Sequence, residues 1–470
     1  MRPSERSARA RLVLTAVACV FTMTLLADPV LAHMGSLGGP LTSVPVPFWL
    51  VVLTGGGIIG ASFLFTSFAT DHEFIRWINA LGVLVPTPAS VWRAAVTGLS
   101  VASVAILLLF VVVGFVGPTD PTRNLAVVGI WAGWWAGYTA SVYLVGDTWS
   151  VVNPWRTIAG VFGSLGGREL TDLPVSSGWV AALGLLAMVY LEVISPLASV
   201  PSLLVWVVLA YSVVTLVGAI TYGDSWFERV DPISRVFRTY GRLAPVRRID
   251  GRLSVGLPAG VLANDYDDAV RGDVVFVVAL VWVTTYDGLV STASFDGFAR
   301  AILGSDPPMV LAYLLYLVVA IAGFLAFLGI YRLAARVSRR TAGSFVSVSV
   351  IERRFVWALV PIAAAYHLAH FLGYFVTFVP TLTGIAANPL APPPSPQIAV
   401  LPDWWGGVQL ALVILGHLVA IWVAHAIAFE TFTGKLQPIR SQYSFAVVTI
   451  CYTMTSMWII AQPYSPPPFL

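Results

Sequence analysis

Long apolar runs separated by short polar and arginine-rich segments make up most of the chain. A run of about 20 apolar residues is long enough to cross a bilayer as a helix. Ten such runs lie near 48–68, 94–117, 125–146, 178–197, 202–222, 274–293, 309–331, 355–379, 406–429 and 444–462. A β-barrel is excluded because barrel strands alternate apolar and polar residues, which the run AILLLFVVV at 105–113 does not. The pattern therefore predicts an all-α, polytopic membrane bundle of about ten transmembrane helices.

Composition supports this fold class and excludes two others. The chain is 58% hydrophobic and 10% charged, with a mean hydropathy of +0.84. A soluble globular protein is about 25% charged, and a disordered chain is rich in charge and poor in apolar residues. A membrane protein with lipid as its surroundings is the class that remains.

Residues 1–32 have the layout of a cleavable signal peptide. Four arginines precede an apolar stretch at 12–26, and small residues occupy positions 30 and 32, which is typical of secretory signals. An uncleaved signal anchor is the alternative. Cleavage after Ala32 would make His33 the new N-terminal residue and leave 33–470 as a single integral membrane domain. It would also remove Cys19, so that Cys451 would be the one remaining cysteine.

The charge balance indicates orientation rather than a nucleic-acid partner. Without residues 1–32 the chain has 22 basic and 21 acidic residues, and no basic stripe with interleaved aromatics, so no nucleic acid is predicted. With the mature N-terminus outside, 20 Lys and Arg fall in inner loops, against Arg123 and Arg300 in outer ones. The positive-inside rule then predicts that both mature termini lie outside, and the predicted location is the plasma membrane. The basic loop 223–273 is predicted to be cytoplasmic, with Arg229–Arg252 on anionic headgroups.

An internal echo predicts a duplicated two-helix unit in parallel orientation. Gly146-Asp147-Thr148-Trp149 and Gly223-Asp224-Ser225-Trp226 lie 77 residues apart, and each precedes a capping residue and a proline, Asn153-Pro154 and Asp231-Pro232. Glycine is predicted to end the long helix, and Asn or Asp with Pro to begin the next short one. Parallel repeats occur in transporters.

Ionisable residues inside the apolar runs are candidates for function, because they are costly in a membrane. Four of them fall at similar estimated depth: Glu192, Asp287, His370 and His417. His370 and His417 with Asp287 or Glu192 form a donor set that suits zinc or copper, with either carboxylate as ligand or catalytic base.

The other histidines leave alternatives open. His425 lies about 12 Å along the helix axis from His417 at 1.5 Å per residue, so the two cannot bind one ion together, and His33 could add ligands from the outer face. His367 shares a helix face with His370. A haem b held between His370 and His417 is the alternative cofactor. The structural alternative for each histidine is that it binds no cofactor and forms a hydrogen bond between neighbouring helices.

Several segments together resemble the fenitrothion hydrolase-like family of polytopic membrane proteins. The matching segments are Ala32-His33-Met34-Gly35, Gly146-Asp147, Asn153-Pro154-Trp155-Arg156, Leu191-Glu192, Thr285-Tyr286-Asp287-Gly288, Ala369-His370, Gly416-His417, Ala424-His425 and Arg440-Ser441-Gln442-Tyr443. The resemblance gives most weight to His33, Asp287, His370, His417 and His425. In the family pattern an Asp follows the histidine that corresponds to His425, and this chain has Ala426 at that position.

Three functions follow as hypotheses. The resemblance implies metal-dependent hydrolysis of organophosphate-like esters, in which a bound metal would supply hydroxide. The repeat and the polar residues at mid-membrane depth favour a transporter or a copper- or other metal-handling permease. The third hypothesis is a haem-binding or structural subunit of a membrane complex.

Overall fold

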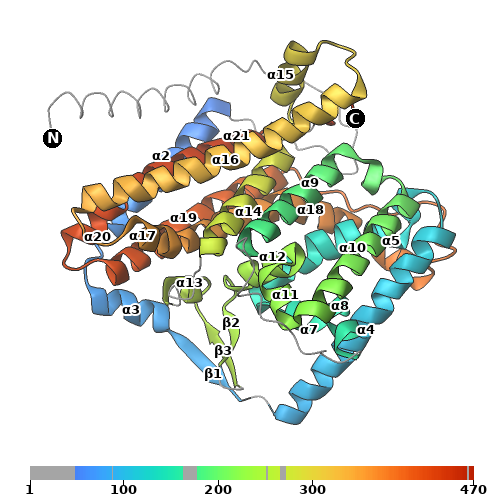
Figure 1. Ribbon diagram of the computed structural model, residues 1–470, viewed down its shortest axis with the longest axis horizontal. Coiled ribbons are helices and arrows are strands. Elements are labelled where there is room, and N and C mark those ends of the chain that lie inside the picture. Colours follow the sequence, from blue (N-terminus) through green and yellow to red (C-terminus); the bar gives the residue numbers. More distant parts are fainter. Residues whose placement is uncertain (1–47, 87, 162–176, 250–251, 265–270, 463–464) are drawn as a thin grey trace.

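The computed structural model describes residues 48–470 except 87, 162–176, 250–251, 265–270 and 463–464. The predicted signal peptide and His33 lie outside the described residues. The fold is a bundle of helices, and a small β-sheet projects from one end of it (Figure 1).

All ten predicted segments are helical, which confirms the all-α, polytopic membrane bundle. In the described part of the chain, eight helical segments are long and apolar enough to cross a membrane. The long helices are α2 (Phe48–Thr66), α4 (Ala89–Val116), α10 (Pro201–Tyr222), α14 (Arg271–Val290), α16 (Met309–Ala342), α18 (Val360–Ala387), α19 (Trp405–Thr431) and α21 (Tyr443–Ile460). The predicted segment at 178–197 is the shorter apolar helix α9 (Ser177–Ile194), and the one at 125–146 is divided into α5 (Leu125–Val128), the π-helix η2 (Gly129–Tyr138) and α6 (Thr139–Val145).

Short helices connect these segments. They are α3 (His72–Ala80), η1 (Pro121–Arg123), α7 (Trp149–Val152), α8 (Pro154–Val161), η4 (Pro196–Ala198), α11 (Asp224–Arg229), α12 (Pro232–Gly241), α13 (Gly260–Asn264), α15 (Ala293–Leu303), α17 (Val348–Phe355), η5 (Val356–Leu359) and α20 (Leu436–Ser441).

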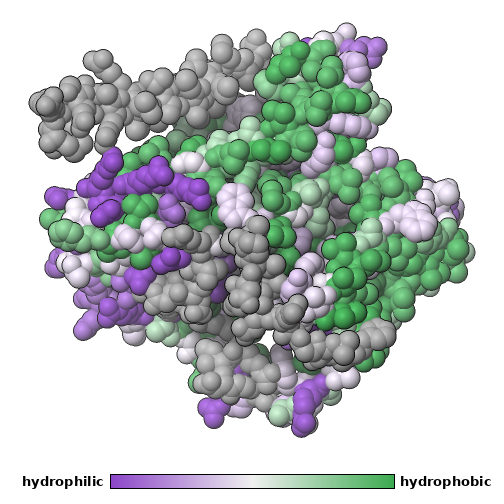
Figure 2. Space-filling model, viewed as in Figure 1, coloured by the Kyte–Doolittle hydropathy of each residue, from purple (hydrophilic) through white to green (hydrophobic). Residues whose placement is uncertain are grey.

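Helix α14 lies at the centre of the bundle, and α4 and α10 lie at its edge (Figure 1). Residues 274–283 of α14 are all buried, and α14 packs along α9, α16 and α18. By contrast, α4 and α10 expose large apolar side chains such as Leu108 and Trp206. Figure 2 shows a hydrophobic surface over α4 and α10, while hydrophilic residues gather where α16 and α20 meet. An apolar outer surface is what contact with lipid requires, because hydrocarbon offers no hydrogen-bond partners.

A three-stranded antiparallel sheet joins two loops that are far apart in the sequence. Its strands are β1 (Gly82–Val85), β2 (Val246–Ile249) and β3 (Arg252–Gly256), in the order β1-β3-β2. The sheet was not predicted, since its strands are short and β1 pairs with β3 across about 170 positions of the chain.

The prediction that Arg229–Arg252 lies on headgroups is wrong for α12. This helix is buried in the bundle through Phe237 and Tyr240, which belong to the main hydrophobic core. Even Arg235 is buried, and its guanidinium lies 2.5 Å from a carboxylate oxygen of Asp273 at the start of α14. A high arginine content indicated a surface, but the apolar residues between the arginines form a face that packs inward.

The structure confirms the predicted helix terminations of the repeat. Gly146 and Gly223 have positive φ angles of 101° and 61° and end α6 and α10. Asn153 and Asp231 each accept a hydrogen bond from the backbone N–H three residues later, at 3.1 and 3.0 Å. The two units also contact each other, because the Asn153 amide donates to the Ser234 hydroxyl at 3.1 Å.

We expect Asn153→Ala to lower the free energy of unfolding by about 1 kcal/mol, the usual cost of losing an N-cap side chain. Chemical denaturation of purified protein in detergent would measure it. Asn153→Asp is the control, since aspartate keeps the capping oxygen and should retain most of the stability. Equal losses in the two variants would contradict the capping role.

Candidate functional site

The π-helix η2 combines small residues with large aromatic ones. Its sequence is GIWAGWWAGY. A Cβ on Gly137 would lie 2.4 Å from the ring of Phe375, so the glycine allows α18 to approach closely. Trp131, Trp134 and Trp135 of the same helix contribute their indole rings to the wall of a cavity. π-Helical turns are rare and are frequently found at functional sites, and here the π-helix lines this cavity.

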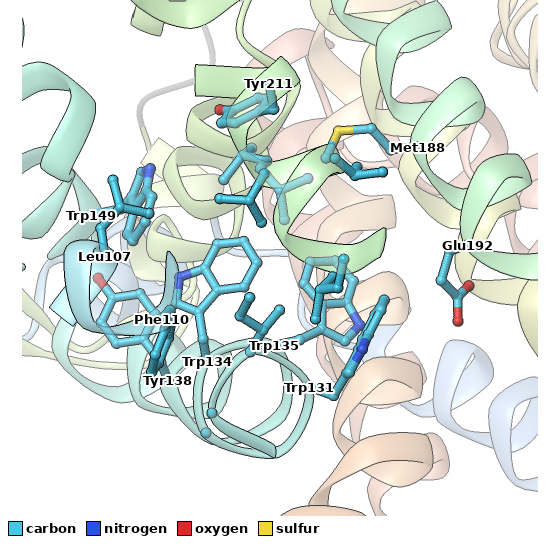
Figure 3. A pocket seen from close by; sticks show the side chains of 18 of the residues that line it. Leu107, Phe110, Trp131, Trp134, Trp135, Tyr138, Trp149, Met188, Glu192 and Tyr211 are labelled. Carbon is cyan, nitrogen blue, oxygen red and sulfur yellow. The ribbon is translucent and has the colours of Figure 1, made fainter. Parts of the chain in front are cut away.

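That cavity has a volume of about 610 Å³ and lies between η2 and helices α4, α9, α10, α14 and α18. Its walls are almost entirely apolar and aromatic (Figure 3). Among the described residues, Glu192 and Asp287 are the acidic side chains that line it, and no Lys, Arg or His does. A largely apolar pocket with a few polar groups is the usual form of a small-molecule site.

Two of the residues predicted from depth, Glu192 and Asp287, line this cavity, and a third, His370, lies next to Asp287. Glu192 is on α9 and Asp287 on α14, and these helices cross so closely that a Cβ on Gly178 would lie 2.2 Å from the Cα of Gly272. The two carboxyl groups are near enough for their charges to interact. Nε2 of His370, on α18, lies 3.5 Å from Oδ2 of Asp287. Their predicted roles as base and ligand stay predictions.

The remaining histidines are held elsewhere. His417 is fully buried, and its Nδ1 lies 2.8 Å from the carbonyl oxygen of Val413 in the same helix. His425 is also buried, with Nε2 2.8 Å from the Ala69 carbonyl oxygen and Nδ1 3.3 Å from the Gln442 amide oxygen. Both ring nitrogens of His425 are therefore occupied by contacts within the protein.

The described donor set does not fit the predicted zinc or copper ion. Across the residues that the structure describes, His, Cys, Asp and Glu side chains form no group of three suited to a metal ion. His33 lies outside the described residues. Neither His370 nor His417 lines the aromatic cavity, and a haem b held between these two histidines stays a prediction.

Sequence reasoning missed the aromatic part of the site and the environment of His367. His367 is buried, and its ring lies within 5.3 Å of the rings of Trp135 and Phe371, centroid to centroid. The available signal was four aromatic residues among glycines and alanines at 129–138. That signal indicates close helix packing as readily as a ligand site.

Tyr211 is fixed at the cavity wall by the cap of α12. Its hydroxyl donates to Oδ1 of Asp231 at 2.5 Å. Burial raises the pKa of the Asp231 carboxyl above its ordinary value, and hydrogen bonds from Ser234 and Tyr211 oppose this shift. The repeat thus positions a cavity residue as well as ending a helix.

Comparison with known proteins adds no relative. No family model matches the chain, and neither a curated protein nor a solved structure matches it. The resemblance to the fenitrothion hydrolase-like family accordingly stays a prediction from short motifs.

Proposed function

We propose that this integral membrane protein is a permease that takes a lipid-soluble small molecule into the cavity. The observation that carries the proposal is the cavity itself, which has about 610 Å³ of largely apolar space inside the bundle. Its volume falls within the roughly 300–1,000 Å³ that is usual for small-molecule sites.

The position of the cavity between the duplicated units favours transport. Its lining includes Trp134 and Trp149 from the first unit and Val208 and Tyr211 from the second. In transporters built from repeats, the substrate site lies at the repeat interface near the middle of the membrane. The parallel repeat and the cavity therefore support the same function class.

Three indole N–H groups in the wall support a ligand that carries a hydrogen-bond acceptor. Those of Trp131, Trp134 and Trp149 are buried and have no hydrogen-bond partner among the described residues. Buried polar groups are ordinarily paired, so an ether or carbonyl oxygen of a ligand would satisfy them.

The other hypotheses have less support. Hydrolysis of organophosphate-like esters rests on the family resemblance and on the contact between His370 and Asp287. Metal handling and haem binding lack a fitting donor set among the described residues. We also propose the plasma membrane as the location, which the predicted signal peptide supports. The arginine distribution supports an orientation with both mature termini outside.

Filling the cavity tests the proposal. We expect Val208→Trp to weaken binding of the apolar fluorophore N-phenyl-1-naphthylamine at least tenfold, because the indole would occupy the space the ligand needs. Binding would be measured by energy transfer from tryptophan in purified protein.

The matched control is Val213→Trp on the same helix, where the side chain is 63% exposed at the outer surface and binding should be unchanged. Equal binding by both variants would overturn the proposal. Consumption of a phosphotriester by the wild type, with loss in His370→Ala, would favour the hydrolase instead.

A further inference from the structure

We propose that the molecule bound in this cavity is a lipophilic cation, with its charge at Glu192 and Asp287. This inference rests on the proposed function and names the substrate class of the same site. It starts from the charge of the wall, since both ionised groups that the described lining can supply are negative.

Protein counter-charge at this end of the cavity is limited. Glu192 forms no hydrogen bond or ion pair with any described residue. For Asp287 the described residues offer one ionisable partner, His370, whose Nε2 lies 3.5 Å from Oδ2 of Asp287. The imidazole of His370 is 31% exposed and does not line the cavity. An ionised carboxylate in apolar surroundings is costly unless it is paired. A cationic ligand would supply the missing partner for Glu192.

The aromatic wall suits the same ligand. Cations are attracted to the faces of Trp and Tyr rings when they lie within about 6 Å, and the attraction increases when water is excluded. Figure 3 shows Glu192 at the side of the cavity where Trp131 lies, across from Tyr138 and Trp149. A positive group at Glu192 would thus lie at the end of the cavity nearer Trp131, while an apolar body fills the remaining space toward Tyr138.

A neutral or anionic ligand fits less well. A neutral molecule of the same shape gains the apolar contacts but leaves both carboxyl groups without a partner. An anion meets like charge, and the described lining offers no Lys, Arg or His to hold it. Charge complementarity therefore selects a cation among molecules that are apolar enough to enter from lipid.

The experiment compares two compounds of the same shape, methyltriphenylphosphonium and its neutral carbon analogue 1,1,1-triphenylethane, for binding to purified wild-type protein. Neither compound carries a hydrogen-bond acceptor, so the two differ in charge alone. We expect the cation to bind at least tenfold more tightly. The double variant Glu192→Gln/Asp287→Asn should lose at least tenfold in affinity for the cation and less than twofold for the neutral compound. Asp296→Asn is the matched control, because this carboxylate pairs with Arg300 outside the cavity, and it should change neither affinity.

Equal affinity of the wild type for the two compounds would overturn the charge assignment. An unchanged affinity of the double variant for the cation would overturn it as well. Retained binding of the neutral compound shows that the double variant is folded. If the wild type binds the two compounds equally and Val208→Trp abolishes the binding of both, the charge assignment fails and the proposed function stands. If Val208→Trp weakens the binding of neither compound, the proposed function fails.

Discussion

Replacing Gly416 with valine is expected to destabilise the packing of α18 against α19 by about 3 kcal/mol. A Cβ at this position would lie 2.1 Å from the Cβ of Ala365 and 2.7 Å from the carbonyl oxygen of Pro361. Because one of these atoms belongs to the backbone of a buried helix, relief requires the two helices to separate. Overpacking typically costs about 1–3 kcal/mol, and a clash with backbone places this variant at the upper end.

Gly407→Val provides the matched control on the same helix. A Cβ on Gly407 meets no heavy atom within 4 Å, so this substitution should leave stability nearly unchanged. Thermal unfolding in detergent, followed by circular dichroism, would compare the two variants. Gly416→Val unfolding at the wild-type temperature would contradict the close contact between α18 and α19.

Replacing Arg235 with alanine is expected to destabilise the protein by about 3 kcal/mol. Its guanidinium is buried, lies 2.5 Å from the Asp273 carboxylate, and stacks over the ring of Phe276 at 4.3 Å. Removing one partner of a buried ion pair costs about 3–5 kcal/mol. The Asp273 side chain is 20% exposed, which places the expected loss at the lower end. Chemical denaturation would measure the change in the free energy of unfolding.

Arg238→Ala, three residues later on the same helix, is the control. Arg238 lies 3.8 Å from Glu228, and both side chains are about half exposed, so the loss should stay below about 0.5 kcal/mol. Adding Asp273→Asn to Arg235→Ala should restore part of the stability, because it removes the carboxylate that lost its arginine. A loss in Arg235→Ala no larger than in Arg238→Ala would contradict the buried pair.

The fold class was predictable because it depends on local properties of the chain. Ten apolar runs predict ten helical segments without any knowledge of their neighbours. The glycine and Asn-Pro or Asp-Pro positions at 146–154 and 223–232 likewise end and begin helices through contacts within a few residues.

For the candidate site, the sequence predicts the depth of each side chain along its helix but not the direction in which the side chain points. Depth along a helix follows from the rise per residue, so Glu192, Asp287 and His370 could be placed at one level. Rotation about the helix axis, and hence the contacts of a side chain, depends on which helices pack where. His417 was predicted for the same level, but its Nδ1 lies against the carbonyl oxygen of Val413 in its own helix.

By itself, the sequence determined that this protein crosses the membrane many times, because hydrophobic run length and arginine placement are read residue by residue. The tertiary structure alone decided three further features. These are the pairing of β1 with β3, the burial of one face of α12 in the bundle, and the aromatic cavity that Glu192 and Asp287 help to line. Each of these depends on contacts between distant segments, whose geometry follows from packing the whole chain at once.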